Sequence, residues 1–415
     1  MKTTITIAML ILLSLTLVGC MTSTYYKPDP PPVEAPLLAE EEYIAVSSYQ
    51  FYMENTEYKH PSEWFPLSNC DENMLAPNSP ARIENANSAF NPAIVALLNK
   101  ENQAKVFDHL DGVIFNAQFL DIPTYEGSGQ IVHPQVIFFA EKFMGFHYIM
   151  VMTPYPFSNN AYENPSILGS QDGVIWEVPE GLINPVVGVP TDVMHGGYYS
   201  DPFILQNGNR LELWFRHTLA INDEGQRVQP RNSHNRIYRT VTWDLTDWTK
   251  LETILDCPNS INHFMSVAVM HNDSTYRLWY TNFNSQLFLI NSTDLINWSE
   301  RTQVKADLNG LGIWHHEIAF TGERYEALFT SANWENQPEF RLFFAVSDDG
   351  IDFGTGSEID IEKISPELTG MTVHKCTFVN HDGVYQMYIA VFNHANVWRL
   401  FYFEVAEEML YRLFG

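Results

Sequence analysis

Ser292-Thr293-Asp294-Leu295-Ile296-Asn297-Trp298 is the stretch that decides the fold, because three similar turns recur along the chain. In each turn an Asp side chain can bind its own backbone, and the aromatic residue four positions later can fill a gap between sheets. The other three turns are Ser170–Trp176, Thr242–Trp248 and Ser347–Phe353. Their recurrence indicates a repeated unit that ends in the same way each time.

Five apolar strands open the repeated units, and each leads into a second, aromatic-rich strand. The openers are Val132–Val136, Ser200–Ile204, Met265–Val269, His315–Ala319 and His374–Phe378. The second strands are Phe146–Met152, Leu211–Phe215, Tyr276–Thr281, Tyr325–Thr330 and Tyr385–Val391, and only the fifth unit lacks the closing turn. Repeats of this length that hold several short strands predict an all-β, five-bladed β-propeller.

Aligning the second strands selects one polar residue per unit as equivalent. These residues are His133, Asp201, Ser266, His316 and Lys375, separated by 50 to 68 residues. In a propeller, equivalent positions at the strand openings lie around one axis. We therefore expect a shared, inward-facing polar site.

The first 42 residues are predicted to lie outside the fold. An apolar run over residues 5–18 follows Lys2 and is too short for a stable membrane span, which is typical of a secretion signal. Leu17-Val18-Gly19-Cys20 resembles the bacterial lipoprotein lipobox, which would make Cys20 the lipid-modified first residue of the mature chain. An ordinary signal peptide that happens to hold a cysteine is the alternative. We expect a signal peptide over 1–19, a tether over 20–42, and a lipid-anchored protein of the bacterial cell envelope that faces the periplasm or the cell surface.

Residues 43–125 do not repeat and are predicted to form an N-terminal extension to a propeller over 126–415. Asn91-Pro92 followed by spaced apolar residues predicts a helix start. The apolar run 113–120 predicts a strand, and we expect it to complete the fifth blade, because an open sheet edge promotes aggregation.

Charge and cysteine content exclude several classes of function. The formal net charge is −27, and it becomes −28 once residues 1–19, with their single lysine, are removed. Such an acidic surface repels phosphate backbones, so nucleic-acid binding is not expected. Apart from Cys20, only Cys70, Cys257 and Cys376 remain, without the C-x-x-C spacing of a zinc site.

The five units, the Asp-Pro at a strand opening and the closing turns resemble the five-bladed propeller glycosidases of glycoside hydrolase family 43 and the related arabinanase, xylosidase and fructosidase group. The best local matches are Tyr199–Leu205, Leu211–Phe215 and Ser292–Trp298. The resemblance covers residues 130–405. It implies an inverting site with an Asp base, a Glu acid and a second Asp that tunes the pKa of the acid.

In this chain the implied catalytic residues are Asp201, Glu317 and His133. The family's Asp-Pro lies in the first blade, where this chain has His133, and the Asp-Pro falls one unit later, at Asp201. Glu317 lies two blades beyond Asp201 and keeps the base-to-acid spacing, but it needs a bulge to face the same side as the aligned His316. Ser266 stands where the tuning Asp is expected.

Other polar and aromatic residues near the strand openings are candidates for binding. The candidate substrate-binding residues are His195, Tyr199, Arg216, Ser266, Trp314, His316 and Lys375. Related propellers hold a calcium-type ion or a water cluster near a fifth-blade histidine, so the resemblance implies a structural calcium site at His374, with no cofactor required for hydrolysis. Structural roles, such as core packing and salt bridging, are the alternative for each residue.

The sequence thus predicts a lipid-anchored glycoside hydrolase that cuts a polysaccharide or oligosaccharide outside the cytoplasm by an inverting acid/base mechanism. A non-catalytic carbohydrate-binding propeller lipoprotein is the alternative, favoured by His133 and Ser266 at positions where carboxylates are expected. A structural or interaction propeller without a glycan ligand is a third interpretation, which leaves the polar strand openings unexplained.

Overall fold

A computed structural model describes residues 46–47, 114–228, 234–258, 263–332 and 340–414. The predicted signal peptide, Cys20, the tether and the helix near Asn91 lie outside these residues. Within the described ranges the regular structure is almost entirely β, with one α-helix, α5 (Glu407–Phe414), at the C-terminal end. No helix in these ranges is long and apolar enough to cross a membrane.

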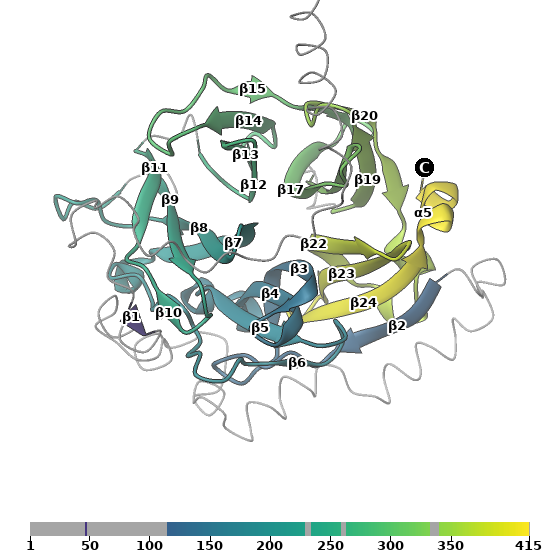
Figure 1. Cartoon of the computed structure of the whole chain (residues 1–415), viewed down its shortest axis with the longest axis horizontal. Helices are drawn as coiled ribbons and strands as arrows, with labels where there is room; N and C mark the ends of the chain where they lie inside the picture. Colours follow the sequence, from purple (N-terminus) through teal and green to yellow (C-terminus); the bar gives the residue numbers. More distant parts are fainter. Residues whose placement is uncertain (1–45, 48–113, 229–233, 259–262, 333–339, 415) are drawn as a thin grey trace, which may run out of the picture. The chain divides into compact units, whose positions relative to one another are not determined.

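Five four-stranded antiparallel sheets surround a common centre and confirm the predicted five-bladed propeller (Figure 1). Blade 1 is β3 (Ile131–Phe143), β4 (Phe146–Pro154), β5 (Ser166–Ser170) and β6 (Trp176–Glu177); blade 2 is β7 (Tyr198–Asn207), β8 (Arg210–Thr218), β9 (Asn235–Thr242) and β11 (Glu252–Cys257). Blade 3 is β12 (Val267–Asn272), β13 (Thr275–Thr281), β14 (Leu287–Ser292) and β15 (Thr302–Gln303); blade 4 is β17 (Gly312–Phe320), β18 (Tyr325–Ala332), β19 (Leu342–Ser347) and β21 (Ser357–Ile359). Blade 5 is β22 (Thr372–His381), β23 (Val384–Phe392), β24 (Trp398–Ala406) and β2 (Ile114–Leu120).

The ring closes through strand β2, which precedes blade 1 in the sequence and supplies the outer strand of blade 5. β2 pairs antiparallel with β24, from Ile114 opposite Val405 to Leu120 opposite Leu400. In Figure 1 the blue β2 therefore lies beside the yellow β24. This pairing gives the outer edge of blade 5 a hydrogen-bonded partner and joins the two ends of the ring.

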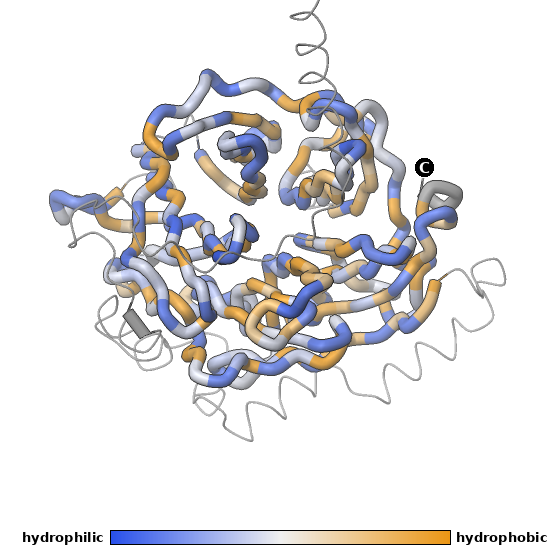
Figure 2. The backbone as a smooth tube through the Cα atoms, in the orientation of Figure 1, coloured by the Kyte–Doolittle hydropathy of each residue, from blue (hydrophilic) through white to orange (hydrophobic). Residues whose placement is uncertain are grey.

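Large aromatic side chains pack between successive blades. Trp214 meets Tyr276 across blades 2 and 3, with ring centroids 6.0 Å apart, and Trp279 meets Tyr325 across blades 3 and 4 at 5.9 Å. Similar pairs join blades 4 and 5 and blades 5 and 1. Hydrophobic stretches consequently occur in every blade (Figure 2). The core is thus a series of layers between blades, in which Cys257 and Cys376 are buried.

Each of the four closing turns is held together by an Asp side chain, as the sequence indicates. In each, one Asp carboxylate oxygen accepts hydrogen bonds from two backbone N–H groups; for Asp349 the donors are Ile351 at 2.7 Å and Asp352 at 2.9 Å. The corresponding acceptors in the other turns are Asp172, Asp244 and Asp294. Trp176, Trp248 and Phe353 are buried behind their turns, whereas Trp298 is half-buried. The repeated sequence therefore encodes a local backbone anchor and an apolar plug.

Replacing Asp349 by Ala is expected to lower the free energy of unfolding by about 1 kcal/mol, the usual effect of losing a carboxylate that caps backbone N–H groups. Chemical denaturation measures the change. Asp348→Ala is the matched control, because this neighbouring carboxylate is exposed and takes no part in the turn bonds described above. Equal stability of the two variants would contradict the proposed role of the turn.

Candidate functional site

The inner strands of four blades are irregular where they open toward the centre of the ring. The register breaks between Val132 and Gln135, between Ser200 and Phe203, between Ile313 and His315, and between Val373 and Cys376. A β-bulge at such a point turns a side chain out of its regular alternation. The bulges bring together side chains of blades 1, 2, 4 and 5, which can meet only around the axis of the ring.

The bulged residues of blades 1 and 2 have a rare backbone conformation. His133 has φ 55° and Asp201 has φ 50°, and each is followed by proline. Residues other than glycine seldom occupy this left-handed region, and strain of this kind is concentrated at functional sites. The His-Pro and Asp-Pro dipeptides thus mark two positions where the backbone is held in a costly conformation to direct a side chain.

Asp201 is the centre of the polar group. Its carboxylate is fully buried and lies 3.1 Å from Nη2 of Arg216, 3.2 Å from Nδ1 of His315 and 3.5 Å from Nε2 of His133. Burial alone would raise the pKa of Asp201, but His133, Arg216 and His315 together hold it well below its usual value. Asp201 is therefore an ionised carboxylate surrounded by nitrogen donors.

His133, His315 and His374, called the histidine cluster below, come from three different blades. Each offers a ring nitrogen, and the three nitrogens lie within 4.8 Å of one another. Nε2 of His315 is 3.3 Å from Nε2 of His374. Burial lowers the pKa of all three rings, and it outweighs the nearby Asp201, which acts to raise them. The rings are thus neutral at pH 7, the form in which imidazole binds a metal ion.

In blades 4 and 5 the structure differs by one residue from the alignment of second strands. That alignment selected His316 and Lys375, whereas the side chains that join His133 and Asp201 are His315 and His374. Bulges change the register of the inner strands, and an alignment of the regular second strands cannot detect them. Ser266 of blade 3 is fully buried, and the described contacts of the cluster come from the other four blades.

Glu163 is a site residue that the sequence analysis did not select. Its carboxylate is buried, and Oε2 lies 3.4 Å from Nδ1 of His133. Burial and the nearby Asp201 raise the pKa of Glu163 well above its usual value, although Arg216 opposes the shift. The only sequence signal was its place in a long ordered loop, Thr153–Pro165. The site therefore holds one ionised and one protonated carboxyl group on either side of His133.

Arg216 supports Asp201 from the adjacent strand. Its guanidinium donates to Ser200 Oγ at 2.9 and 2.7 Å and lies over the ring of Tyr198. Burial alone would lower the pKa of Arg216, but Asp201 and other neighbours raise it. This candidate for substrate binding is thus engaged in holding the carboxylate.

Glu317 and Lys375 are both buried next to this group and interact electrostatically. Burial raises the pKa of Glu317 to about 8, although Lys375 and Gln135 act against the shift. Burial lowers the pKa of Lys375, which interacts with both Asp201 and Glu317. His316 is also buried, and its pKa is lowered to about 3, mainly by burial.

Aromatic rings surround the more accessible side of the histidine cluster. His374 is its one half-buried member, and Trp398 lies 5.1 Å and Phe340 6.1 Å from it, centroid to centroid. Half-buried Trp314 lies 5.5 Å from His315, and Tyr155 packs on Trp398 at 4.9 Å. Such rings can stack on the apolar face of a sugar.

His195 and Tyr199 lie at a different place from the other candidate binding residues. Both line a cavity of about 570 Å³ on blade 2, called the blade-2 pocket below. His195 is exposed and belongs to the segment before β7, whereas Tyr199 is buried and packs against His217 at 4.9 Å. The predicted substrate-binding residues therefore divide between two sites.

Comparison with known proteins identifies relatives that act on carbohydrates. No protein-family model matches the chain. The A type blood N-acetyl-alpha-D-galactosamine deacetylase of Flavonifractor plautii is 25% identical over 279 residues, or 57% of this chain and 36% of that protein. The chain thus spans about a third of the length of this curated relative.

Solved structures share the fold. The N-acetylgalactosamine deacetylase from F. plautii, in complex with blood group B trisaccharide, has a TM-score of 0.58 at 18% identity, over 72% of this chain and 97% of that one. An exo-1,5-alpha-L-arabinanase from a bovine ruminal metagenomic library has a TM-score of 0.46 at 12% identity, over 66% and 92%. The GH43 BlXynB protein from Bacillus licheniformis has the same TM-score and identity, over 67% and 55%. The five sheets described above confirm the predicted propeller fold, and the F. plautii structure shares that fold.

The raised pKa of Glu317 predicts a pH-dependent stability. Between about pH 4.3, where an unfolded Glu titrates, and about pH 8, the folded chain keeps a proton that the unfolded chain releases. The free energy of unfolding therefore falls as pH rises through this window. In Glu317→Gln this contribution disappears, so thermal unfolding measured from about pH 5 to 8 should show a smaller decline than in the unchanged chain.

Glu323→Gln is the control for this measurement, because Glu323 is exposed in the turn after β17. Its decline with pH should equal that of the unchanged chain. If Glu317→Gln declined as steeply as the control, the carboxyl group of Glu317 would not be protonated in the folded state.

Proposed function

We propose that this chain is a carbohydrate-active hydrolase that removes the acetyl group from an N-acetylated sugar, with a divalent metal ion held by the histidine cluster. The observation that carries the proposal is the meeting of three neutral imidazoles beside the ionised Asp201. The 25% identity to a protein named as an N-acetyl-galactosamine deacetylase supports the same chemistry.

The donor set fits a metal that prefers nitrogen ligands. Three histidines with an open position are typical of catalytic zinc and related divalent ions, whereas calcium prefers oxygen. The contact between the Asp201 carboxylate and Nδ1 of His315, at 3.2 Å, matches the carboxylate–histidine pairs that orient metal ligands. We therefore assign the ion to the whole cluster, in place of a calcium ion at His374 alone. When bound, it would supply Lewis-acid activation of water and of the acyl carbonyl.

The surrounding residues have distinct tasks in this proposal. Asp201 is a positioning residue that orients His315 and His133, and Arg216 holds Asp201 ionised. Glu163 keeps a proton near His133 and is assigned to protonation of the departing amine nitrogen. The rings of Trp314 and Trp398 would contact the sugar and exclude water from the cluster.

Inverting glycoside hydrolysis by Asp201 and Glu317 is the second candidate function. The pKa of about 8 for Glu317 favours it, because a general acid must hold its proton near neutral pH. The contacts of Asp201 argue against it, since a base that is ion-paired with Arg216 and also lies against the ring nitrogens of two neutral histidines is poorly disposed to take a proton from water. A propeller that only binds carbohydrate is the remaining alternative and predicts no turnover.

In this proposal the enzyme acts outside the cytoplasm. The lipobox-like Leu17–Cys20 after an apolar run supports an N-terminal lipid anchor in the bacterial cell envelope. A membrane-anchored enzyme facing the periplasm or the cell surface would meet polysaccharides or oligosaccharides there.

Acetate release from N-acetylgalactosamine-terminated oligosaccharides tests the proposal. Activity should disappear on chelation and return with a divalent metal, and His315→Ala should lower kcat/KM at least about hundredfold. Asp201→Asn should lower metal affinity or activity about 10–100-fold, as loss of a partner to a ligand histidine usually does. His271→Ala is the control, because this ring packs on Tyr276 in blade 3 instead of joining the cluster.

Two results would overturn the metal-dependent assignment. One is acetate release that survives both chelation and His315→Ala. The other is release of sugar fragments without acetate, abolished by Asp201→Asn and by Glu317→Gln, which would establish the glycosidase instead.

Glu163→Gln separates proton transfer from metal binding. The variant should bind the metal as the unchanged chain does, while kcat falls about 10²–10⁴-fold, the usual contribution of a positioned acid. Metal binding is measured by titration and kcat by acetate release. An unchanged kcat would remove Glu163 from the chemistry and leave it as a neighbour of His133.

A further inference from the structure

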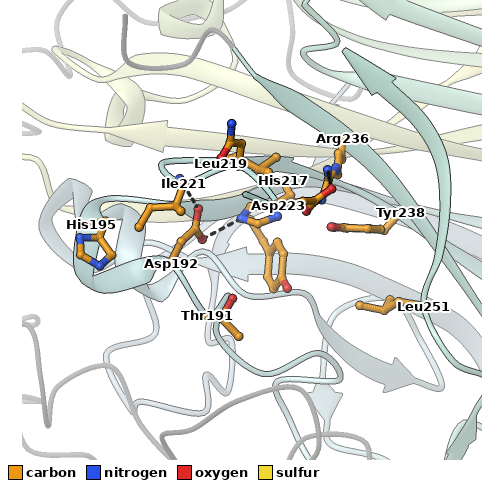
Figure 3. Close-up of a pocket in the computed structure, with 12 residues that line it drawn as sticks. Thr191, Asp192, His195, His217, Leu219, Ile221, Asp223, Arg236, Tyr238 and Leu251 are labelled. Atoms are coloured by element: carbon orange, nitrogen blue, oxygen red, sulfur yellow. Dashed lines mark hydrogen bonds and ion pairs between the residues drawn. The ribbon is translucent and has the colours of Figure 1, made fainter. Parts of the chain in front are cut away.

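The blade-2 pocket is a second polar cavity that the chemistry proposed above does not use. It measures about 570 Å³, within the range of small-molecule sites. Figure 3 shows side chains from three segments around it: the stretch before β7, the loop after β8, and strand β9. Thr191 and Asp192 represent the first segment, Ile221 and Asp223 the second, and Tyr238 the third.

The walls of this pocket are tied together by one carboxylate. Oδ2 of Asp192 accepts hydrogen bonds from the backbone N–H groups of Ala220 at 2.6 Å and Ile221 at 3.3 Å, and Oδ1 accepts from Nε2 of His217 at 2.9 Å (Figure 3). A Cβ at position 197 would lie 2.1 Å from Oδ1 of Asp192, so only glycine there leaves room for this arrangement. The pocket is therefore built before any ligand arrives.

One buried ring nitrogen in the pocket lacks a partner of its own. His217 is 7% exposed, and its Nδ1 has no hydrogen-bond partner among the described residues. Nε2 of the same ring is hydrogen-bonded to Asp192, so Nδ1 is the ring nitrogen left for a ligand. A buried polar atom without a partner is costly, so the pocket suits a ligand with a group that can both donate and accept a hydrogen bond, such as a hydroxyl group.

The remaining lining selects the charge and shape of that ligand. The carboxylates of the lining have partners within the protein: Asp192 is hydrogen-bonded to His217, and Oδ1 of Asp223 accepts from Nη1 of Arg236 at 2.9 Å. No cation of the described lining is left over for a phosphate or a sulfate. Tyr199 and Tyr238 add aromatic surface next to His217, with ring centroids 4.9 and 5.9 Å from it.

We propose that the blade-2 pocket binds a neutral sugar residue of a glycan, as a site separate from the histidine cluster. A hydroxyl of the sugar forms a hydrogen bond with Nδ1 of His217, and an aromatic side chain contacts the ring face of the sugar. Tyr199 and His217 are opposite each other in the pairing of β7 and β8, and the next pair along is Ser200 with Arg216. Strand alternation directs these two pairs to opposite faces of blade 2. Since Arg216 contacts Asp201, the pocket is separated from Asp201.

This inference does not depend on the chemistry proposed for the histidine cluster, because binding is measured without turnover. The full chain is titrated by calorimetry with galactose, xylose, arabinose and N-acetylgalactosamine. Thr191→Trp places an indole at the exposed edge of the pocket and should weaken the affinity for the best of these sugars at least tenfold. Thr302→Trp, at an exposed position on blade 3, should leave the affinity unchanged.

Asp201→Asn separates the two sites. Binding that persists in Asp201→Asn and is lost in Thr191→Trp supports the blade-2 pocket, whether or not acetate is released by the unchanged chain. Two results would overturn the inference: no binding of any of the four sugars, or equal affinity in the unchanged chain and in a Thr191→Trp variant that melts at the same temperature.

Discussion

The buried carboxylate of Asp201 is the charge on which the centre of the ring depends. An ionised group without solvent is destabilising unless other charges and donors surround it. Here Arg216, His315 and His133 do so at 3.1 to 3.5 Å, and they come from three blades. The electrostatic requirement of one side chain thus connects parts of the chain more than a hundred residues apart. Asp201 also lies against His315 and His133, while burial keeps the pKa of both rings low.

The bulges are the structural means by which the ring meets this requirement. A regular strand would direct alternate residues of the inner strands toward the neighbouring blades. An extra residue at the opening of β3, β7, β17 and β22 turns a polar side chain toward the axis instead, with left-handed backbone at His133 and Asp201. The packed aromatic layers between the blades hold these openings in place, so the stability of the core supports the strained site.

How much of the fold and of the site the sequence could predict depends on how far apart in the chain the interacting residues lie. The closing turns are local, because Asp294 binds N–H groups two and three residues away, and such turns can be recognised from residue types. His133 and Asp201 were found for a related reason, since the proline after each marks the strand opening. His315 was passed over in favour of its neighbour His316, because one inserted residue reverses the facing of a strand. Glu163 reaches the site from a loop, where no periodicity exists to indicate direction.

By itself, the sequence determined the number of blades, the turns that end them and the polar character of the strand openings, because each of these follows from residues close together in the chain. Only the tertiary structure decided which histidines meet, that Asp201 lies among nitrogen donors, and that His195 and Tyr199 belong to a separate pocket. Those outcomes depend on bulges and on contacts between blades, and a bulge of one residue leaves no mark in composition or spacing. The chemistry proposed for the site accordingly moved from a pair of carboxylates to a cluster of imidazoles.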